Sequence, residues 1–183
     1  MDTQAQQLAQ MLARDSIRNC IASLARGEDR RDAQLISSAY WQDAYIDFGM
    51  FEGPFETYLG FVVPGDPSLP CTLHVLGQTH IEFPAELVGE TARAETLVMS
   101  YHRIDTGAGH KDAMIGGRYL DSMAQRGGEW RIARRTMLYD FYQDWGQAID
   151  WSEGVMGMQF SAEHFAGRAV GDYSEVFFGK HGG

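Results

Sequence analysis

The sequence predicts an α+β fold in which N-terminal helices pack on one face of a long, curved antiparallel sheet. Apolar residues recur at helical spacing near the start of the chain, between Leu8 and Leu24. Long segments of alternating apolar and polar residues follow, separated by glycine-rich turns, as in an antiparallel meander. Because the 183 residues show no second domain and no internal repeat, we expect one domain over 1–183, with its core at about 10–142 and a C-terminal extension over 144–183.

The composition excludes several classes of function. The chain is 44% hydrophobic and 22% charged, so it should fold. Its net charge of −10 and pI of about 4.9 disfavour binding to nucleic acid or to an anionic membrane surface. With no bilayer-spanning apolar run and no secretory leader, the expected location is the cytoplasm. Cys20 and Cys71 are expected to be reduced thiols that pack as small apolar groups.

The first helix is predicted over Leu8–Leu24. Its apolar phase changes at Asp15 and Ser16, either of which is suited to cap a restarted helix. The segment Ala25–Gly27 is a typical helix end. We therefore expect the helix to be interrupted once and to stop at the glycine.

The connector Gly27–Asp32 carries two aspartates with different expected roles. Asp32 is placed to cap the next helix, predicted over Ala33–Trp41, because a short side-chain oxygen accepts hydrogen bonds from the first free amides. Asp29 is not placed to cap that helix. An acid in a connector is most simply solvated, but this one is also a candidate for a functional site.

The next elements follow from alternation and from proline positions. A strand is expected at Ala44–Gly49, then a short helix at Phe55–Val62 with Pro54 near its first turn, then a loop at Pro64–Pro70. Four strands complete the sheet, at Thr72–Phe83, Thr91–Ile104, Ala113–Ala124 and Glu129–Tyr142.

The tail from Asp144 is rich in glycine and aromatic residues. Its large side chains either cover the outer sheet or a neighbouring subunit, or close the mouth of a pocket and exclude water. The residues concerned are Trp145, Trp151, Phe160 and Phe165.

Three ionisable residues carry the candidate chemistry. His74 lies in an apolar strand, where a lone histidine is most often structural. Arg135 adjoins Arg134 on a strand, so one of the two faces inward and needs an anionic or carbonyl partner. Together with Asp29, they form a possible set in which Asp orients the imidazole as a base and Arg stabilises an anion.

Strand alternation predicts what surrounds these residues. One face of the strand Thr91–Ile104 carries Ala94, Thr96, Val98, Ser100 and His102. Ile115 and Tyr119 share a face of the next strand. Since both faces are apolar, the sheet should enclose a pocket on one side and be covered on the other, for example by another subunit.

Several short motifs resemble one superfamily. They are Arg26–Asp32, Tyr40–Ala44, Leu73–Gly77, Gly117–Asp121 and Gly128–Arg135. Over most of residues 10–142 their order resembles the SnoaL-like branch of the nuclear-transport-factor-2-like superfamily, nearest to dehydrochlorinases, bile acid 7α-dehydratases, scytalone dehydratases and γ-formaldehyde lyases. The resemblance implies a cone-shaped barrel, with the sheet wrapped around the helices, that uses no cofactor and commonly forms a homotrimer.

The resemblance also implies roles for individual residues. Asp29 falls on an aspartate that orients the proton-abstracting histidine, His74 falls on that histidine, and Arg135 falls on an arginine of the last strand. Leu24 stands where several relatives have a tyrosine. The implied substrate-binding residues are Leu24, Ile46, Phe48, Thr96, Val98, His102, Ile115, Tyr119 and Tyr139.

The resulting hypothesis is a cofactor-independent lyase that removes water, halide or formaldehyde from a small hydrophobic, aromatic substrate. Two alternatives remain: an isomerase that uses the same base, and a non-catalytic module that binds a small molecule. No metal is expected, because the six histidines include no closely spaced ligand pair.

Overall fold

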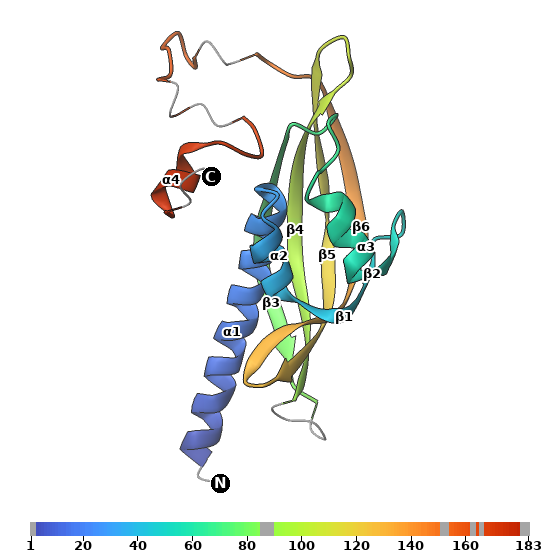
Figure 1. The fold of residues 1–183 in the computed structure, drawn as a ribbon, viewed down its shortest axis with the longest axis vertical. Coiled ribbons are helices and arrows are strands. Elements are labelled where there is room, and N and C mark those ends of the chain that lie inside the picture. Colours follow the sequence, from blue (N-terminus) through green and yellow to red (C-terminus); the bar gives the residue numbers. More distant parts are fainter. Residues whose placement is uncertain (1–2, 85–89, 151–153, 162–163, 165–166, 180–183) are drawn as a thin grey trace.

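The computed structural model describes residues 3–84, 90–150, 154–161, 164 and 167–179. It has the predicted α+β architecture, with helices first and a long curved sheet after them (Figure 1). The helices are α1 (Thr3–Asp29), α2 (Ala33–Ala39), α3 (Phe55–Val62) and α4 (Tyr173–Phe177). The strands are β1 (Tyr40–Asp47), β2 (Glu52–Pro54), β3 (Cys71–Glu82), β4 (Thr91–Asp105), β5 (His110–Arg126) and β6 (Glu129–Gln147).

The sheet has six strands in the order β2-β1-β6-β5-β4-β3. Strands β3 to β6 form the predicted antiparallel meander, but β1 pairs with β6 in parallel, so the sheet is mixed. The direction of β1 is not set by a hairpin with β6, because β2, α3, β3, β4 and β5 lie between them in the sequence. The edge strands β2 and β3 are not paired with each other, so the sheet is open and not a closed barrel.

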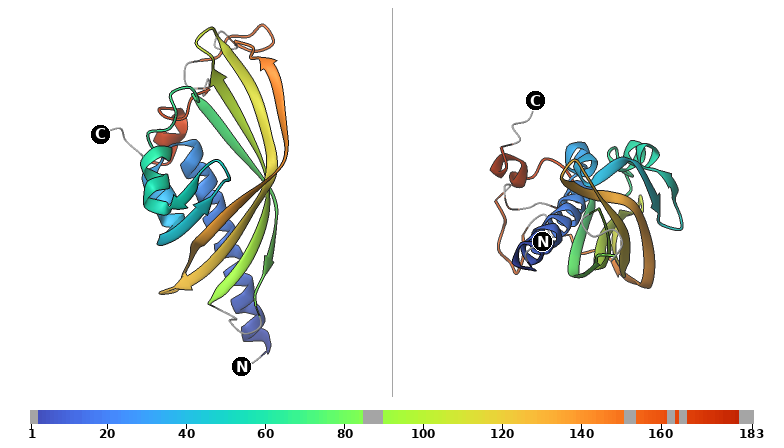
Figure 2. Two further views of the ribbon diagram at one scale, coloured as in Figure 1. Left: turned by 90° about the vertical axis from the view of Figure 1, so that its right-hand side faces the viewer. Right: turned by 90° about the horizontal axis from the view of Figure 1, so that it is seen from below.

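The helices α1, α2 and α3 lie on the same side of the bent sheet (Figure 2). The main core forms between them and the sheet. Ile17, Ile21 and Leu24 of α1 pack there with Ile46 of β1 and Ile132 of β6, and all five side chains are at most 1% exposed. Burial of each such side chain stabilises the fold by about 1.5–3 kcal/mol.

Helix α1 is continuous through Asp15 and Ser16, so the predicted restart is wrong. The phase change has another cause. The N-terminal part of α1 projects past the end of the sheet (Figure 1), and its apolar residues are exposed. Leu8, Met11 and Leu12 are 56–66% exposed, and the buried stripe begins only at Ile17.

The helix also ends later than predicted. It continues through Gly27 to Asp29, and the residue with left-handed backbone geometry after it is Arg31, with φ of 50°. Gly27 instead allows close packing, since a Cβ there would lie 2.9 Å from Cγ1 of Ile36 in α2. The prediction for Asp32 is confirmed: its carboxylate accepts hydrogen bonds from the backbone N–H groups of the two residues after Ala33.

Among the other boundaries, β1 spans Tyr40–Asp47 instead of the predicted Ala44–Gly49, and β6 continues to Gln147 beyond the predicted end at Tyr142. Helix α3 spans Phe55–Val62 and follows Pro54, as predicted. Helix α2 stops at Ala39, before the predicted end at Trp41, because Tyr40 already pairs with Ile132 of β6. No helix in the described part of the chain is long and apolar enough to cross a membrane.

The described part of the tail packs beside the C-terminal end of α1. Asp172 forms an ion pair with Arg30 at 3.1 Å, and the guanidinium of Arg26 lies 4.5 Å from the ring centre of Phe178. Trp145 belongs to β6, whereas Trp151 and Phe165 lie outside the described residues. The role of the tail at a subunit interface stays a prediction.

Candidate active site

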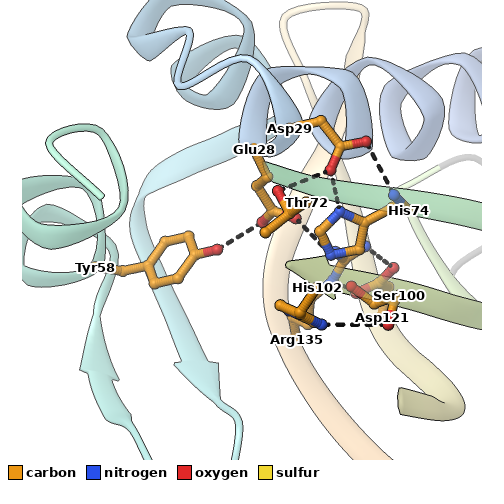
Figure 3. A network of polar contacts seen from close by, with 9 residues as sticks. All are labelled: Glu28, Asp29, Tyr58, Thr72, His74, Ser100, His102, Asp121 and Arg135. Carbon is orange, nitrogen blue, oxygen red and sulfur yellow. Dashed lines mark hydrogen bonds and ion pairs between the residues drawn. The ribbon is translucent and has the colours of Figure 1, made fainter. Parts of the chain in front are cut away.

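The centre of the site is a bonded pair formed by Asp29 and His74 (Figure 3). Asp29 lies in the last turn of α1, and His74 lies on β3. Oδ1 of Asp29 is 2.7 Å from Nδ1 of His74, and Oδ2 accepts a hydrogen bond from the His74 backbone N–H at 2.9 Å. As an ionised acceptor, the carboxylate favours the tautomer with its proton on Nδ1, which leaves Nε2 free to act as a base.

The Asp29 carboxylate is held firmly although it is buried. Thr72 of β3 donates a third hydrogen bond to Oδ1 at 3.2 Å. A negative charge at the C-terminal end of a helix is opposed by the helix dipole. The three donors from one strand compensate for this position and dock the end of α1 onto β3.

The two carboxylates beside His74 determine how its ring titrates. Burial opposes the charged form, but the hydrogen bond to Asp29 and the charges of Glu28 and Asp29 outweigh it and raise the pKa of His74 above its ordinary value. Arg135 acts in the opposite direction. The protonated form of the His74 ring is therefore stabilised by its surroundings.

Glu28, the residue before Asp29, approaches the same imidazole from the other side. Its side chain is 6% exposed, and Oε2 lies 4.0 Å from Nε2 of His74. Its other oxygen accepts a hydrogen bond of 2.6 Å from the hydroxyl of Tyr58 in α3. The imidazole thus has one carboxylate near each ring nitrogen.

These groups open onto a pocket of about 380 Å³, a size suited to a small organic molecule. Its wall is mainly aromatic and apolar, with polar groups at Glu28, Arg31, Asp66, Thr72, His74, Ser100 and His102. The lining residues are Glu28, Arg31, Phe48, Met50, Tyr58, Phe61, Val62, Gly65, Asp66, Leu69, Thr72, His74, Ser100, His102, Ile115, Tyr119, Met137 and Tyr139.

Ser100 and His102 supply the polar groups of β4. Ser100 lies directly opposite His74 in the sheet register, and its hydroxyl has no hydrogen-bond partner among the described residues. Nδ1 of His102 lies 3.2 Å from the Ser100 carbonyl, the geometry of a ring N–H donor, which leaves Nε2 as an acceptor. Burial, together with the charge of His74, lowers the pKa of His102, so His102 takes up a proton less readily than His74 does.

Arg135 lies behind the pocket wall. Its Nε and Nη2 donate to the two carboxylate oxygens of Asp121, both at 2.8 Å, and both residues are at most 2% exposed. The guanidinium also lies 3.9 Å from the ring centre of Tyr119, which does line the pocket. Arg135 is therefore placed to hold Tyr119 and to balance the buried charge of Asp121.

Comparison with known proteins places this geometry in a family. Residues 9–136 match the sequence pattern of the SnoaL-like domain, which is more than half of the chain. The chain belongs to the SnoaL-like family. No functionally curated protein matches it in sequence.

Solved structures with the same fold superpose on most of this SnoaL-like protein. A hexachlorocyclohexane dehydrochlorinase, LinA type 2, superposes with a TM-score of 0.66 at 16% identity, covering 87% of this chain and 99% of that chain. A protein from Novosphingobium aromaticivorans, provisionally named a scytalone dehydratase, has a TM-score of 0.66 at 15% identity, with coverages of 84% and 99%. A third, an NTF2-like protein with a cystatin-like fold from the same organism, has a TM-score of 0.60 at 20% identity, with coverages of 76% and 92%. At these identities the likeness concerns the fold.

The structure of this SnoaL-like protein divides the predicted substrate-binding residues into two groups. Five line the pocket: Phe48, His102, Ile115, Tyr119 and Tyr139. The other four are buried and do not line it: Leu24, Ile46, Thr96 and Val98. Val98 packs against Tyr119 and Met137, so it supports the wall from behind. Among the described residues, no three His, Cys, Asp or Glu side chains are arranged to hold a metal ion.

Sequence reasoning missed Glu28 and Tyr58. A signal for Glu28 was present, because Ile17, Ile21, Leu24 and Glu28 follow one stripe at steps of four, three and four residues. An acid at a core position of an amphipathic helix indicates a function. Tyr58 gave no comparable signal, since a tyrosine in an apolar helix reads as core.

Proposed function

We propose that this protein is a cofactor-independent lyase in which His74 is the base and Asp29 orients it. The observation that supports this most strongly is the double hydrogen bonding between Asp29 and His74 at the wall of a pocket. A base of this kind needs a fixed tautomer, a free nitrogen facing the substrate and a partner for the charge that forms. The Asp29–His74 pair meets all three requirements.

In the proposed reaction, Nε2 of His74 removes a proton from a carbon or hydroxyl of the substrate. For loss of halide or water, the proton comes from carbon, the electron pair of the broken C–H bond forms a new double bond, and the leaving group departs with the electrons of its own bond. A departing hydroxyl takes the proton back from the His74 imidazolium and leaves as water. For loss of formaldehyde, the proton comes from a hydroxymethyl group, the O–H electron pair forms the carbonyl bond of formaldehyde, and the electrons of the broken C–C bond pass to the remaining carbon, which takes up the proton from the imidazolium. Asp29 stabilises the imidazolium through Nδ1.

Arg135 enters this proposal as a positioning residue. Its Nε and Nη2 both donate to Asp121, while its contact with Tyr119 fixes one aromatic wall. Phe48 and Tyr58 form further walls, and their rings lie 5.5 Å apart in an edge-to-face arrangement. These walls suit a flat aromatic substrate.

We also propose that the outer face of the sheet forms a homo-oligomer, with a trimer favoured. Four apolar side chains on this face are 37–47% exposed: Leu73, Val75, Met99 and Leu138. Val75 and Met99 are direct cross-strand neighbours, so this apolar surface extends from β3 onto β4. Light scattering should give a trimer mass for wild type and a smaller mass for Val75→Glu, and a wild-type monomer would contradict the proposal.

The test of the lyase proposal is turnover of a substrate found by screening aromatic alcohols and halides. His74→Ala should abolish turnover, and Asp29→Asn should lower kcat by a factor on the order of 10²–10⁴, the usual size of a general-base contribution. Asp32→Asn is the matched control, since Asp32 caps α2 and does not line the pocket. If folded His74→Ala and Asp29→Asn keep wild-type kcat/KM, the assignment is wrong.

A further inference from the structure

Glu28 is a buried acid whose placement is not explained by packing alone. It lies at the end of the apolar stripe of α1, the residue is 8% exposed, and its side chain lines the pocket. Tyr58 satisfies one carboxylate oxygen. The other oxygen faces Nε2 of His74, the nitrogen that Asp29 leaves free.

The distance between these two atoms is informative. At 4.0 Å, Oε2 of Glu28 and Nε2 of His74 are too far apart for a hydrogen bond to each other. A single oxygen lying to one side of the line that joins them reaches both at about 2.8–2.9 Å. A hydroxyl group fits this position chemically, because it donates its proton to one atom and accepts from the other when His74 is protonated.

The charges around this position disfavour an anionic ligand. Glu28 and Asp29 flank one imidazole, so the polar end of the pocket carries more negative than positive charge. Arg135 is already paired with Asp121. Arg31, which also lines the pocket, directs its terminal nitrogens to the backbone carbonyls of the loop at Pro64–Leu69.

Ser100 is an independent sign of a polar ligand. The residue is 5% exposed, it lines the pocket opposite His74, and its hydroxyl has no hydrogen-bond partner among the residues described. A buried hydroxyl without a partner destabilises the ligand-free protein. In a pocket, this cost is recovered when a bound molecule supplies the partner.

We propose that the pocket selects a neutral, hydroxylated aromatic molecule, that its hydroxyl group lies between Oε2 of Glu28 and Nε2 of His74, and that Glu28 is the specificity-determining residue. The proposal rests on the proposed lyase function, in which His74 is the base. Ser100 supplies a contact for a polar atom of the same molecule. Carboxylated or phosphorylated aromatics are excluded by the charge of Glu28.

The test compares three ring compounds that differ in one group: 4-methylphenol, 4-methylanisole and 4-methylbenzoate. Their affinities for the full-length protein at neutral pH are measured by calorimetry or ligand-detected NMR. Wild type should bind the phenol about tenfold more tightly than either of the others. Equal or tighter binding of the benzoate would overturn the proposal.

Glu28→Gln tests the role of the acid directly. Because the Tyr58 hydroxyl holds the amide oxygen, the amide NH₂ turns toward His74 and no longer accepts a proton from the ligand. The preference for the phenol should then fall to about twofold or less. Glu56→Gln, an exposed glutamate on α3, makes the same charge change and should leave all three affinities unchanged.

Two further measurements keep the outcome unambiguous. If Glu28→Gln does not fold, Tyr58→Phe keeps the aromatic wall, frees the carboxylate and should weaken the preference by about threefold or more. The probes carry no leaving group, so binding is independent of turnover. Asp29→Asn should lower kcat as stated above, so unchanged turnover in that variant would sink only the lyase function. Unchanged affinities in both Glu28→Gln and Tyr58→Phe would sink only the present proposal.

Discussion

Asp29 bonds His74 at two points, through the ring Nδ1 at 2.7 Å and through the backbone N–H at 2.9 Å. One carboxylate therefore fixes both the position of the strand and the orientation of the imidazole. A side chain held at two points loses little further freedom when the substrate binds. This arrangement makes the His74 ring a rigid part of the pocket wall.

The pH dependence of activity should follow His74. The base must be neutral to accept a proton, and its pKa is raised above its ordinary value by Asp29 and Glu28, against the effect of burial. We therefore expect kcat/KM to rise with pH through an inflection above about 6.5, the unperturbed value for histidine. In Glu28→Gln the inflection should move to lower pH, and an unmoved inflection would show that Glu28 does not act on His74.

The stability of the fold should change with pH in the opposite direction. Because the folded-state pKa of His74 is raised above the unfolded one, its stabilising contribution is fully present below about pH 6.5 and is lost as pH rises through the folded value. Urea unfolding of wild type and His74→Gln at several pH values measures this contribution. The difference in unfolding free energy between wild type and His74→Gln should become smaller as the pH is raised from slightly acid to alkaline.

Ser100→Ala should separate stability from ligand binding. The substitution removes a buried hydroxyl that has no partner among the described residues, so we expect the free energy of unfolding to rise by about 1 kcal/mol. Substrate affinity should fall, because the ligand loses a polar contact. Ser122→Ala, at an exposed position of β5, is the control and should change neither quantity. If Ser100→Ala instead lowers the free energy of unfolding, the Ser100 hydroxyl makes a hydrogen bond in the native protein.

Gly27→Ala should destabilise the protein although alanine favours helices. The new methyl group would lie 2.9 Å from Ile36 Cγ1 and 3.0 Å from its backbone nitrogen, so α1 and α2 must separate. Overpacking of this kind costs about 1–3 kcal/mol. Gly60→Ala in α3 is the matched control. Its methyl group meets no atom within 4 Å, so this variant should gain about 0.5–1 kcal/mol in thermal or urea unfolding.

Arg135→Met should destabilise the fold strongly. It leaves the Asp121 carboxylate buried without its partner, which costs about 3–5 kcal/mol. The double variant Arg135→Met/Asp121→Leu removes both charges and should recover most of that loss. Because Arg135 does not line the pocket, the folded double variant should keep kcat within about tenfold, or 1.4 kcal/mol, of wild type. A far larger fall would give Arg135 a direct part in the reaction.

Much of the fold could be predicted because its signals are local. Strand alternation grouped His102 with Ser100 on one face and Tyr119 with Ile115 on another, and the family resemblance implied that these faces line the pocket. The short side chain of Asp32 identified the start of α2. The parallel pairing of β1 with β6 could not be predicted this way. It depends on contacts between segments far apart in the chain, and no turn motif records it.

The candidate site was predicted unevenly for a related reason. Side chains alternate between the two faces of a strand, so the sequence shows which residues share a face. Whether such a residue lines the pocket depends on whether other side chains pack between it and the cavity. Thr96 faces inward yet is 0% exposed because Thr79 and the core cover it. Glu28 was not predicted, although it continues the helical stripe of Ile17, Ile21 and Leu24.

The position of the two acids at the end of α1 limits how this protein can change during evolution. Glu28 and Asp29 are adjacent, so about 100° of helical rotation separates them, and that angle directs one carboxylate to each nitrogen of His74. Inserting or deleting one residue between Leu24 and Glu28 would rotate both carboxylates away from His74. In related proteins that share this site, insertions and deletions should therefore occur in loops and before Ile17. The number of residues in the last turns of α1 should stay constant.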